Sequence, residues 1–174
     1  AKACTYGNSG GCGLHGSYDD AWDYAGGQGG LNSWGGYPLN HLNSISCQTN
    51  KEVNRYQFQL TSNYRIYGND EGAMYNRLQS YGPISAMVDA RNWRTYNGGV
   101  ISSTNMECSR SRQNINHAVQ IVGLHTTDHT WENSYWIVRN SWGTSFGYSG
   151  YAYVQYGCNT CGIATFAYQP TMTV

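Results

Sequence analysis

The spacing of hydrophobic and polar positions changes about half-way along the chain. Before residue 83, residues 18–25 and 70–80 carry apolar side chains at helical spacing. Beyond it come four short apolar or alternating runs, which Gly, Asn and polar clusters separate: residues 84–88, 118–124, 135–138 and 151–156. Such runs are typical of an antiparallel sheet. The pattern predicts an α+β protein, with a helical subdomain at residues 1–80 packed on a β-rich antiparallel subdomain at residues 81–174.

End signals support the two predicted helices. Ser17 precedes the first helix and Asp20 follows three residues later, as in a helix N-terminal cap. Two glycines at residues 26–27 end that helix, and Gly82 followed by Pro83 stops the second. Residues 1–16 and 28–50 are rich in Gly and turn-forming residues, and residues 57–67 favour an extended segment.

Charge excludes two classes of partner. Ten basic residues balance ten acidic ones, and no basic run occurs, so we expect neither nucleic acid nor an anionic membrane as a partner. No apolar stretch has the roughly 18 residues of a membrane span. Only 11% of the residues are charged, which leaves little repulsion between copies and favours self-association. The first residues, Ala-Lys, suggest a processed end.

Six dispersed cysteines predict disulfides and therefore an oxidising compartment, secreted or alternatively lysosomal. Cys158 and Cys161 have the spacing of a metal or redox pair, but no second pair or histidine partner follows them. His125 and His129 are four residues apart in a stretch without helical character, so they predict no metal site. We expect no metal and no cofactor.

One histidine differs from the other four in its surroundings. His117 stands at the start of a predicted strand, which would hold its ring rigidly, and Asn140 comes directly after the next strand. Four motifs in this region occur in an order that resembles the papain-like cysteine proteases, most closely the cathepsin L branch. They are NHAVQIVG (116–123), YWIVRNSWG (135–143), GYSGY (147–151) and CGIA (161–164). The resemblance covers nearly the whole chain and implies a papain-like fold with a truncated helical part.

The resemblance also implies a partial active site. His117 would be the general base, Asn140 would orient its ring and Trp142 would shield their hydrogen bond from water. The nucleophilic Cys of that family lies in a Gln-then-Cys-Trp segment upstream of the region that Ala1 to Cys12 match, and this sequence lacks that segment. Cys12 precedes a helix but matches a family disulfide position, so we do not expect it to be the nucleophile.

Further positions follow from the same resemblance. It implies the disulfides Cys4–Cys47 and Cys108–Cys161 and leaves over Cys12 and Cys158, which pair with each other, with another chain, or not at all. Phe166 matches a position on the floor of the main substrate pocket, which its ring would narrow. Gly16, after His15, stands where family glycines pair with the substrate backbone.

Three functions are compatible with this sequence. The first is a non-catalytic papain-like protein with a structural or self-assembling extracellular role, whose partners are copies of itself. The second is the larger chain of a two-chain cysteine endopeptidase, completed by an N-terminal chain that carries the thiol. The third is a decoy that binds peptides or inhibitors without cutting them. The sequence favours the first.

Overall fold

The computed structural model describes residues 17–27, 29–33, 55–127 and 130–173. The chain forms two compact units, residues 1–64 with 170–174 and residues 65–169. This division differs from the boundary predicted at residue 80, because the second helix belongs to the β-rich unit, where Met74 is fully buried in the core.

Besides parts of two longer strands that it shares with the second unit, the described part of the first unit contains one helix and a small sheet. The elements are α2 (Tyr18–Gly27), β1 (Gly30–Asn32) and β2 (Arg55–Gln57), and the two strands pair antiparallel. Ser17 caps α2, since its Oγ accepts a hydrogen bond from the Asp20 backbone N–H at 3.1 Å. Gly30 has φ +146°, and a Cβ there would clash with the carbonyl of Tyr56, so only glycine fits at this close approach.

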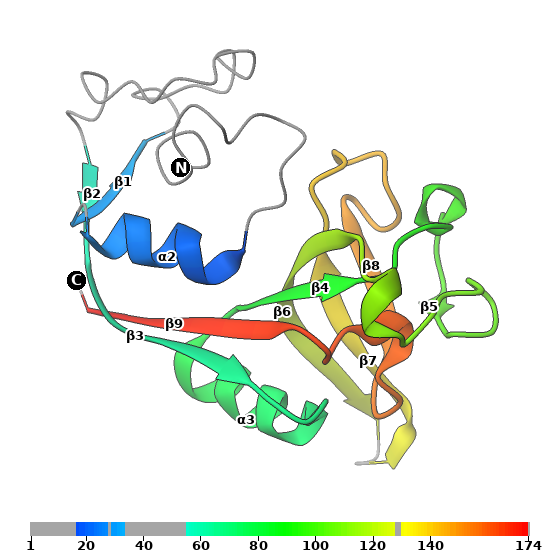
Figure 1. The fold of residues 1–174 in the computed structure, drawn as a ribbon. Helices are drawn as coiled ribbons and strands as arrows, with labels where there is room; N and C mark the ends of the chain where they lie inside the picture. Colours follow the sequence, from blue (N-terminus) through cyan, green and yellow to red (C-terminus); the bar gives the residue numbers. More distant parts are fainter. Residues whose placement is uncertain (1–16, 28, 34–54, 128–129, 174) are drawn as a thin grey trace. The chain divides into compact units, whose positions relative to one another are not determined.

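Most strands of the second unit form one mixed sheet (Figure 1). Its elements are β3 (Gln59–Ile66), α3 (Glu71–Tyr81), β4 (Ile84–Val88), β5 (Val100–Ile101), β6 (His117–Thr127), β7 (Thr130–Arg139), β8 (Tyr151–Gln155) and β9 (Ala167–Thr173), with short 3-10 turns η4 (Trp93–Thr95), η5 (Arg112–Asn114) and η6 (Thr160–Gly162). The strand order is β3-β9-β4-β6-β7-β8-β5. Both β3 and β9 have residues in each unit.

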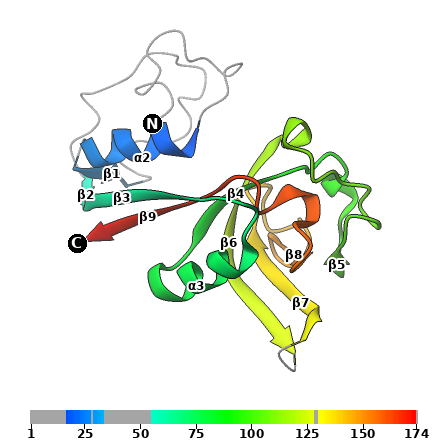
Figure 2. The same ribbon diagram turned by 60° about the horizontal axis from the view of Figure 1, so that its bottom comes forward.

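Alternation along the strands builds the core of this unit. In β4, Ile84, Ala86 and Val88 are fully buried, and the residues between them are half-buried. Trp136 and Val138 of β7 are buried in the same core. Helix α3 contacts β6, as Figures 1 and 2 show. The predicted α+β papain-like fold is therefore confirmed.

Local signals set the limits of α3. Asp70 caps it by accepting a hydrogen bond from the Ala73 N–H at 2.8 Å, and the N–H of Gly82, at φ +87°, bonds to the Leu78 carbonyl. None of the described helices is long and apolar enough to cross a bilayer.

One detail of the sheet corrects the sequence prediction. The expectation of an antiparallel second half is wrong for β5, which pairs parallel with β8. A two-residue strand is too short to show a hydrophobic period, so its direction is set by the chain path around it. The sequence also gave no signal for β9, whose first four residues are all buried and therefore do not alternate.

Candidate active site

The backbone on both sides of the strand start holds His117 in place. His117 is the first residue of β6 and lies opposite Val88 of β4, and the N–H of Asn116 donates to the Val88 carbonyl at 3.0 Å. The side-chain oxygen of Asn116 accepts from the Ala90 N–H at 3.0 Å. The imidazole therefore starts from a rigid backbone, as the sequence analysis predicts.

A side-chain hydrogen bond joins His117 to Asn140. Asn140 follows β7, and its N–H bonds to the Gly150 carbonyl at 3.0 Å. His117 Nε2 lies 2.8 Å from Asn140 Oδ1, which also accepts from the Ser141 N–H at 2.7 Å. Because an amide oxygen only accepts, Nε2 carries the proton, and Nδ1 is the ring nitrogen that remains to take a proton. Asn140 thus fixes the orientation and the tautomer of the ring.

Aromatic rings cover this pair. The ring of Trp142 lies 4.7 Å from that of His117, centroid to centroid, at an interplanar angle of 35°. Phe146 meets Trp142 edge-on at 5.3 Å and packs against Trp93 and Tyr96 in the core. Trp142 is 38% exposed, so it forms a partly open cover over the imidazole. The sequence predicts Trp142 in this place but gave no sign of the support from Phe146.

Comparison with known proteins identifies the family of this chain. The model of the papain family of cysteine proteases matches residues 2–171. The chain belongs to the papain family. It is 35% identical to procathepsin L of Felis catus over 97% of this chain and 49% of that protein. It is 45% identical to human cathepsin O over 56% of this chain and 28% of that protein.

Solved structures show the same fold. The bromelain protease of Ananas comosus, in complex with the E64 inhibitor, has a TM-score of 0.73 at 29% identity, covering 90% of this chain and 70% of that one. The digestive procathepsin L2 proteinase of Tenebrio molitor has a TM-score of 0.74 at 29% identity, covering 98% and 52%. The predicted relationship to the cathepsin L branch is therefore confirmed. This papain-family chain spans between about a quarter and a half of the curated relatives cited above.

The remaining predicted positions have different outcomes. The structure contains the disulfide Cys108–Cys161, and Cys158 is an exposed free thiol. Phe166 precedes β9, and its carbonyl accepts from the Met87 N–H at 3.0 Å. Gly16, Cys4, Cys12 and Cys47 lie outside the described residues, so their roles and pairings stay predictions. Across the described ranges, no group of three or more His, Cys, Asp and Glu residues could hold a metal ion.

A buried carboxylate near the histidine is a feature that the sequence analysis missed. Asp89 follows β4 and is inaccessible to solvent. It accepts from the Arg91 side chain at 2.9 Å, from the Ser109 N–H at 2.7 Å and from the Asn116 amide at 3.4 Å. Burial alone would raise the pKa of Asp89, but the hydrogen bonds from Arg91 and Ser109 outweigh it and lower the pKa. The resulting anion positions Asn116, the neighbour of His117.

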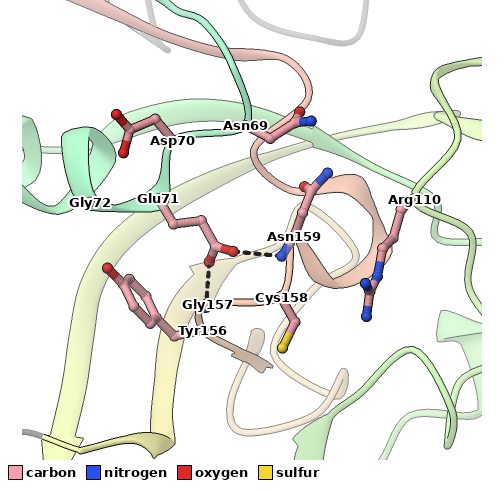
Figure 3. Close-up of a pocket in the computed structure, with 9 residues that line it drawn as sticks. All are labelled: Asn69, Asp70, Glu71, Gly72, Arg110, Tyr156, Gly157, Cys158 and Asn159. Atoms are coloured by element: carbon pink, nitrogen blue, oxygen red, sulfur yellow. Dashed lines mark hydrogen bonds between the residues drawn. The ribbon is translucent and has the colours of Figure 1, made fainter.

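A pocket of about 560 Å³ lies on the same unit between α3 and the turn after β8 (Figure 3). Glu71 lies at its wall, is only 6% exposed, and accepts from Trp136 Nε1 at 2.7 Å and from the N–H groups of Gly157 and Asn159 at 3.0 and 2.6 Å. Both carboxylate oxygens thus accept hydrogen bonds from other residues of the chain. The dashed lines in Figure 3 mark the two bonds from backbone N–H groups. Glu71 therefore holds the turn onto the helix, and the pocket adds no group to the His117 site.

Proposed function

We propose that this chain carries the general-base half of a cysteine endopeptidase site and that the nucleophilic thiol comes from polypeptide outside these 174 residues. The supporting observation is the 2.8 Å contact between His117 Nε2 and Asn140 Oδ1, which keeps Nδ1 ready to take a proton. Membership of the papain family supports the reaction class. This proposal reverses the preference drawn from the sequence, because a non-catalytic role needs no oriented histidine tautomer.

The proposed mechanism uses each of the three side chains. Nδ1 of His117 takes the proton of the thiol, and the thiolate attacks the peptide carbonyl carbon. The imidazolium, held by the Asn140 amide oxygen, then gives its proton to the leaving amine as the C–N bond breaks. Water, deprotonated by the same ring, hydrolyses the thioester and regenerates the thiol. Trp142 limits water beside the Nε2 hydrogen bond, which strengthens it.

A second candidate function is a secreted structural protein that assembles with copies of itself and does not cut peptides. Two observations favour it: the exposed thiol of Cys158, available for a link between chains, and the low charged content of 11%. A decoy that binds peptides or inhibitors is the third. All three are compatible with a secreted or lysosomal location, which the buried disulfide Cys108–Cys161 supports.

The test combines mass measurement with thiol labelling. Native protein is treated with an epoxide that alkylates activated thiolates, and the intact masses are compared with and without reductant. We expect one label on a cysteine outside residues 1–174, lost in His117→Ala and kept in the matched control His125→Ala, whose ring is exposed on the same strand. Homomultimers linked through Cys158, without any label, would instead establish the structural role. Unlabelled protein that still binds peptides would establish the decoy.

A further inference from the structure

Two arginines approach the same aromatic ring. The guanidinium carbon of Arg65 lies 5.4 Å from the ring centroid of Phe166, and that of Arg112 lies 4.6 Å from it. Arg65 also contacts the rings of Tyr67 and Tyr168, at 5.0 and 5.6 Å. These five residues, the arginine–phenylalanine cluster, all belong to the second compact unit.

The charges of this cluster are not neutralised by the described part of the chain. The ion pair found there joins Arg91 to Asp89, and neither Arg65 nor Arg112 takes part in it. Nε of Arg65 is buried and has no hydrogen-bond partner in the described residues. Stacking on an aromatic face stabilises a guanidinium but leaves the N–H groups in its plane free to bind an acceptor. Two positive charges beside one ring repel each other, and a bound anion would offset this repulsion.

The sheet register places the backbone of Phe166 close to the start of the strand that carries His117. The Phe166 carbonyl bonds to Met87 of β4, and Met87 lies opposite Ala118, which follows His117. Phe166 is thus two strand spacings, about 10 Å, from the start of β6. Arg112 reaches the same end of the sheet because η5 lies just before that strand.

We propose that Arg65 and Arg112 form a binding site for the carboxylate of an acidic residue in a peptide held near His117. The guanidinium N–H groups bind the two carboxylate oxygens, and the Phe166 ring supports the aliphatic stem of a glutamate. An extended peptide advances about 3.4 Å per residue, which puts this acidic residue within about three positions of the bond presented to His117. The inference rests on the proposed function in that the carboxylate is carried by a peptide.

The test compares two peptides that differ only in Glu against Gln at the position concerned. Binding is measured by fluorescence anisotropy on the full protein with His117→Ala, so that cleavage does not interfere. We expect the Glu peptide to bind about ten-fold more tightly at low salt, and the preference to shrink at high salt. Arg112→Gln should remove the preference, and Arg112→Lys should keep only part of it, because lysine lacks the planar fork.

Matched controls separate this site from general charge effects. Arg94→Gln, at another exposed arginine of the same unit, should leave the preference unchanged. Since Arg65 is partly buried, its Gln variant counts only if its thermal unfolding matches that of the parent protein. Equal binding of both peptides, no binding of either, or equal loss in Arg94→Gln would overturn the site. Those results leave the thiol-labelling test untouched, and failure of labelling with a retained Glu preference would overturn catalysis alone.

Discussion

At the scale of single residues, the tautomer of one histidine determines what the site can do. The Asn140 side-chain oxygen accepts a hydrogen bond from the Nε2–H of His117, so the opposite ring nitrogen, Nδ1, is the one offered to a substrate or thiol. Asn140 is itself held by two hydrogen bonds. Its backbone N–H donates to the Gly150 carbonyl, and its side-chain oxygen accepts from the Ser141 N–H. The pair is therefore oriented before any ligand binds.

Replacing Asn140 should release this ring. In Asn140→Ala, Nε2 loses its acceptor, so we expect a mixture of the two neutral tautomers and faster solvent exchange of the ring proton. Long-range ¹H–¹⁵N spectra of the imidazole measure both. Asn97→Ala, at an exposed asparagine, serves as the control. An unchanged single tautomer in Asn140→Ala would show that the amide does not orient the ring.

The side chain of Glu71 stabilises the turn after β8 by accepting hydrogen bonds from its backbone. Its loss in Glu71→Ala leaves the indole N–H of Trp136 and two backbone N–H groups without acceptors. We expect the free energy of unfolding to fall by about 3 kcal/mol or more, since each buried unpaired donor costs roughly 1–3 kcal/mol. Denaturant titration followed by tryptophan fluorescence measures it. Asn76→Ala, exposed on the same helix, should change it by less than about 0.5 kcal/mol.

At the scale of elements, a row of stacked rings crosses neighbouring strands. The rings of His125, Tyr135, Tyr153 and Tyr148 stack in that order, with centroids 4.5–4.7 Å apart, across β6, β7 and β8 and the turn before β8. Burial raises the pKa of Tyr135, and the neighbouring tyrosines raise it further. Cross-strand pairs of this kind stabilise the sheet.

The raised pKa of Tyr96 leads to a prediction of how the stability of this unit changes at alkaline pH. Burial raises its pKa, although the hydrogen bond from the Tyr153 N–H lowers it. Because the pKa is higher in the folded than in the unfolded chain, its stabilising contribution is complete below about pH 10 and is lost as the pH rises through the folded value.

We therefore expect the free energy of unfolding to decline above about pH 10, and to decline less steeply in Tyr96→Phe. Denaturant titrations at pH 8 to 11, with tyrosinate absorbance at 295 nm, measure the effect. Tyr56→Phe, 73% exposed on β2, should leave the slope unchanged. A slope that is the same in Tyr96→Phe and in the parent protein would contradict this assignment.

At the scale of the whole molecule, the two units differ in their described cores. Outside β9, Ala25 is the one buried hydrophobic residue among the described residues of the first unit. The core cluster of the second unit instead joins α3 to residues from all seven strands of the large sheet. Stability should follow this distribution, because protection against unfolding grows with buried apolar contact.

The rates of amide hydrogen exchange should therefore differ between the two units. We expect the amides of α2 to exchange well before those of β4, β6 and β7, whose exchange should require global unfolding. Mass spectrometry of peptic peptides measures the order. Equal protection of α2 and β6 would mean that the units unfold together.

The sequence determined the local elements and the identity of the site. Short-range signals placed α2, α3 and the strands β4, β6, β7 and β8, because caps, glycines and periodicity act between neighbouring residues. The motifs around His117, Asn140 and Trp142 predicted the papain family for the same reason: each is a contiguous run of residues.

Only the tertiary structure decided which distant residues meet. The three donors to Glu71 come from residues 65 to 88 positions further along the chain. The two arginines at Phe166, Arg65 and Arg112, lie 101 and 54 positions before it in the sequence. The parallel pairing of β5 likewise depends on the path of the chain. Such contacts follow from how whole elements pack, and no pattern confined to neighbouring positions carries that information.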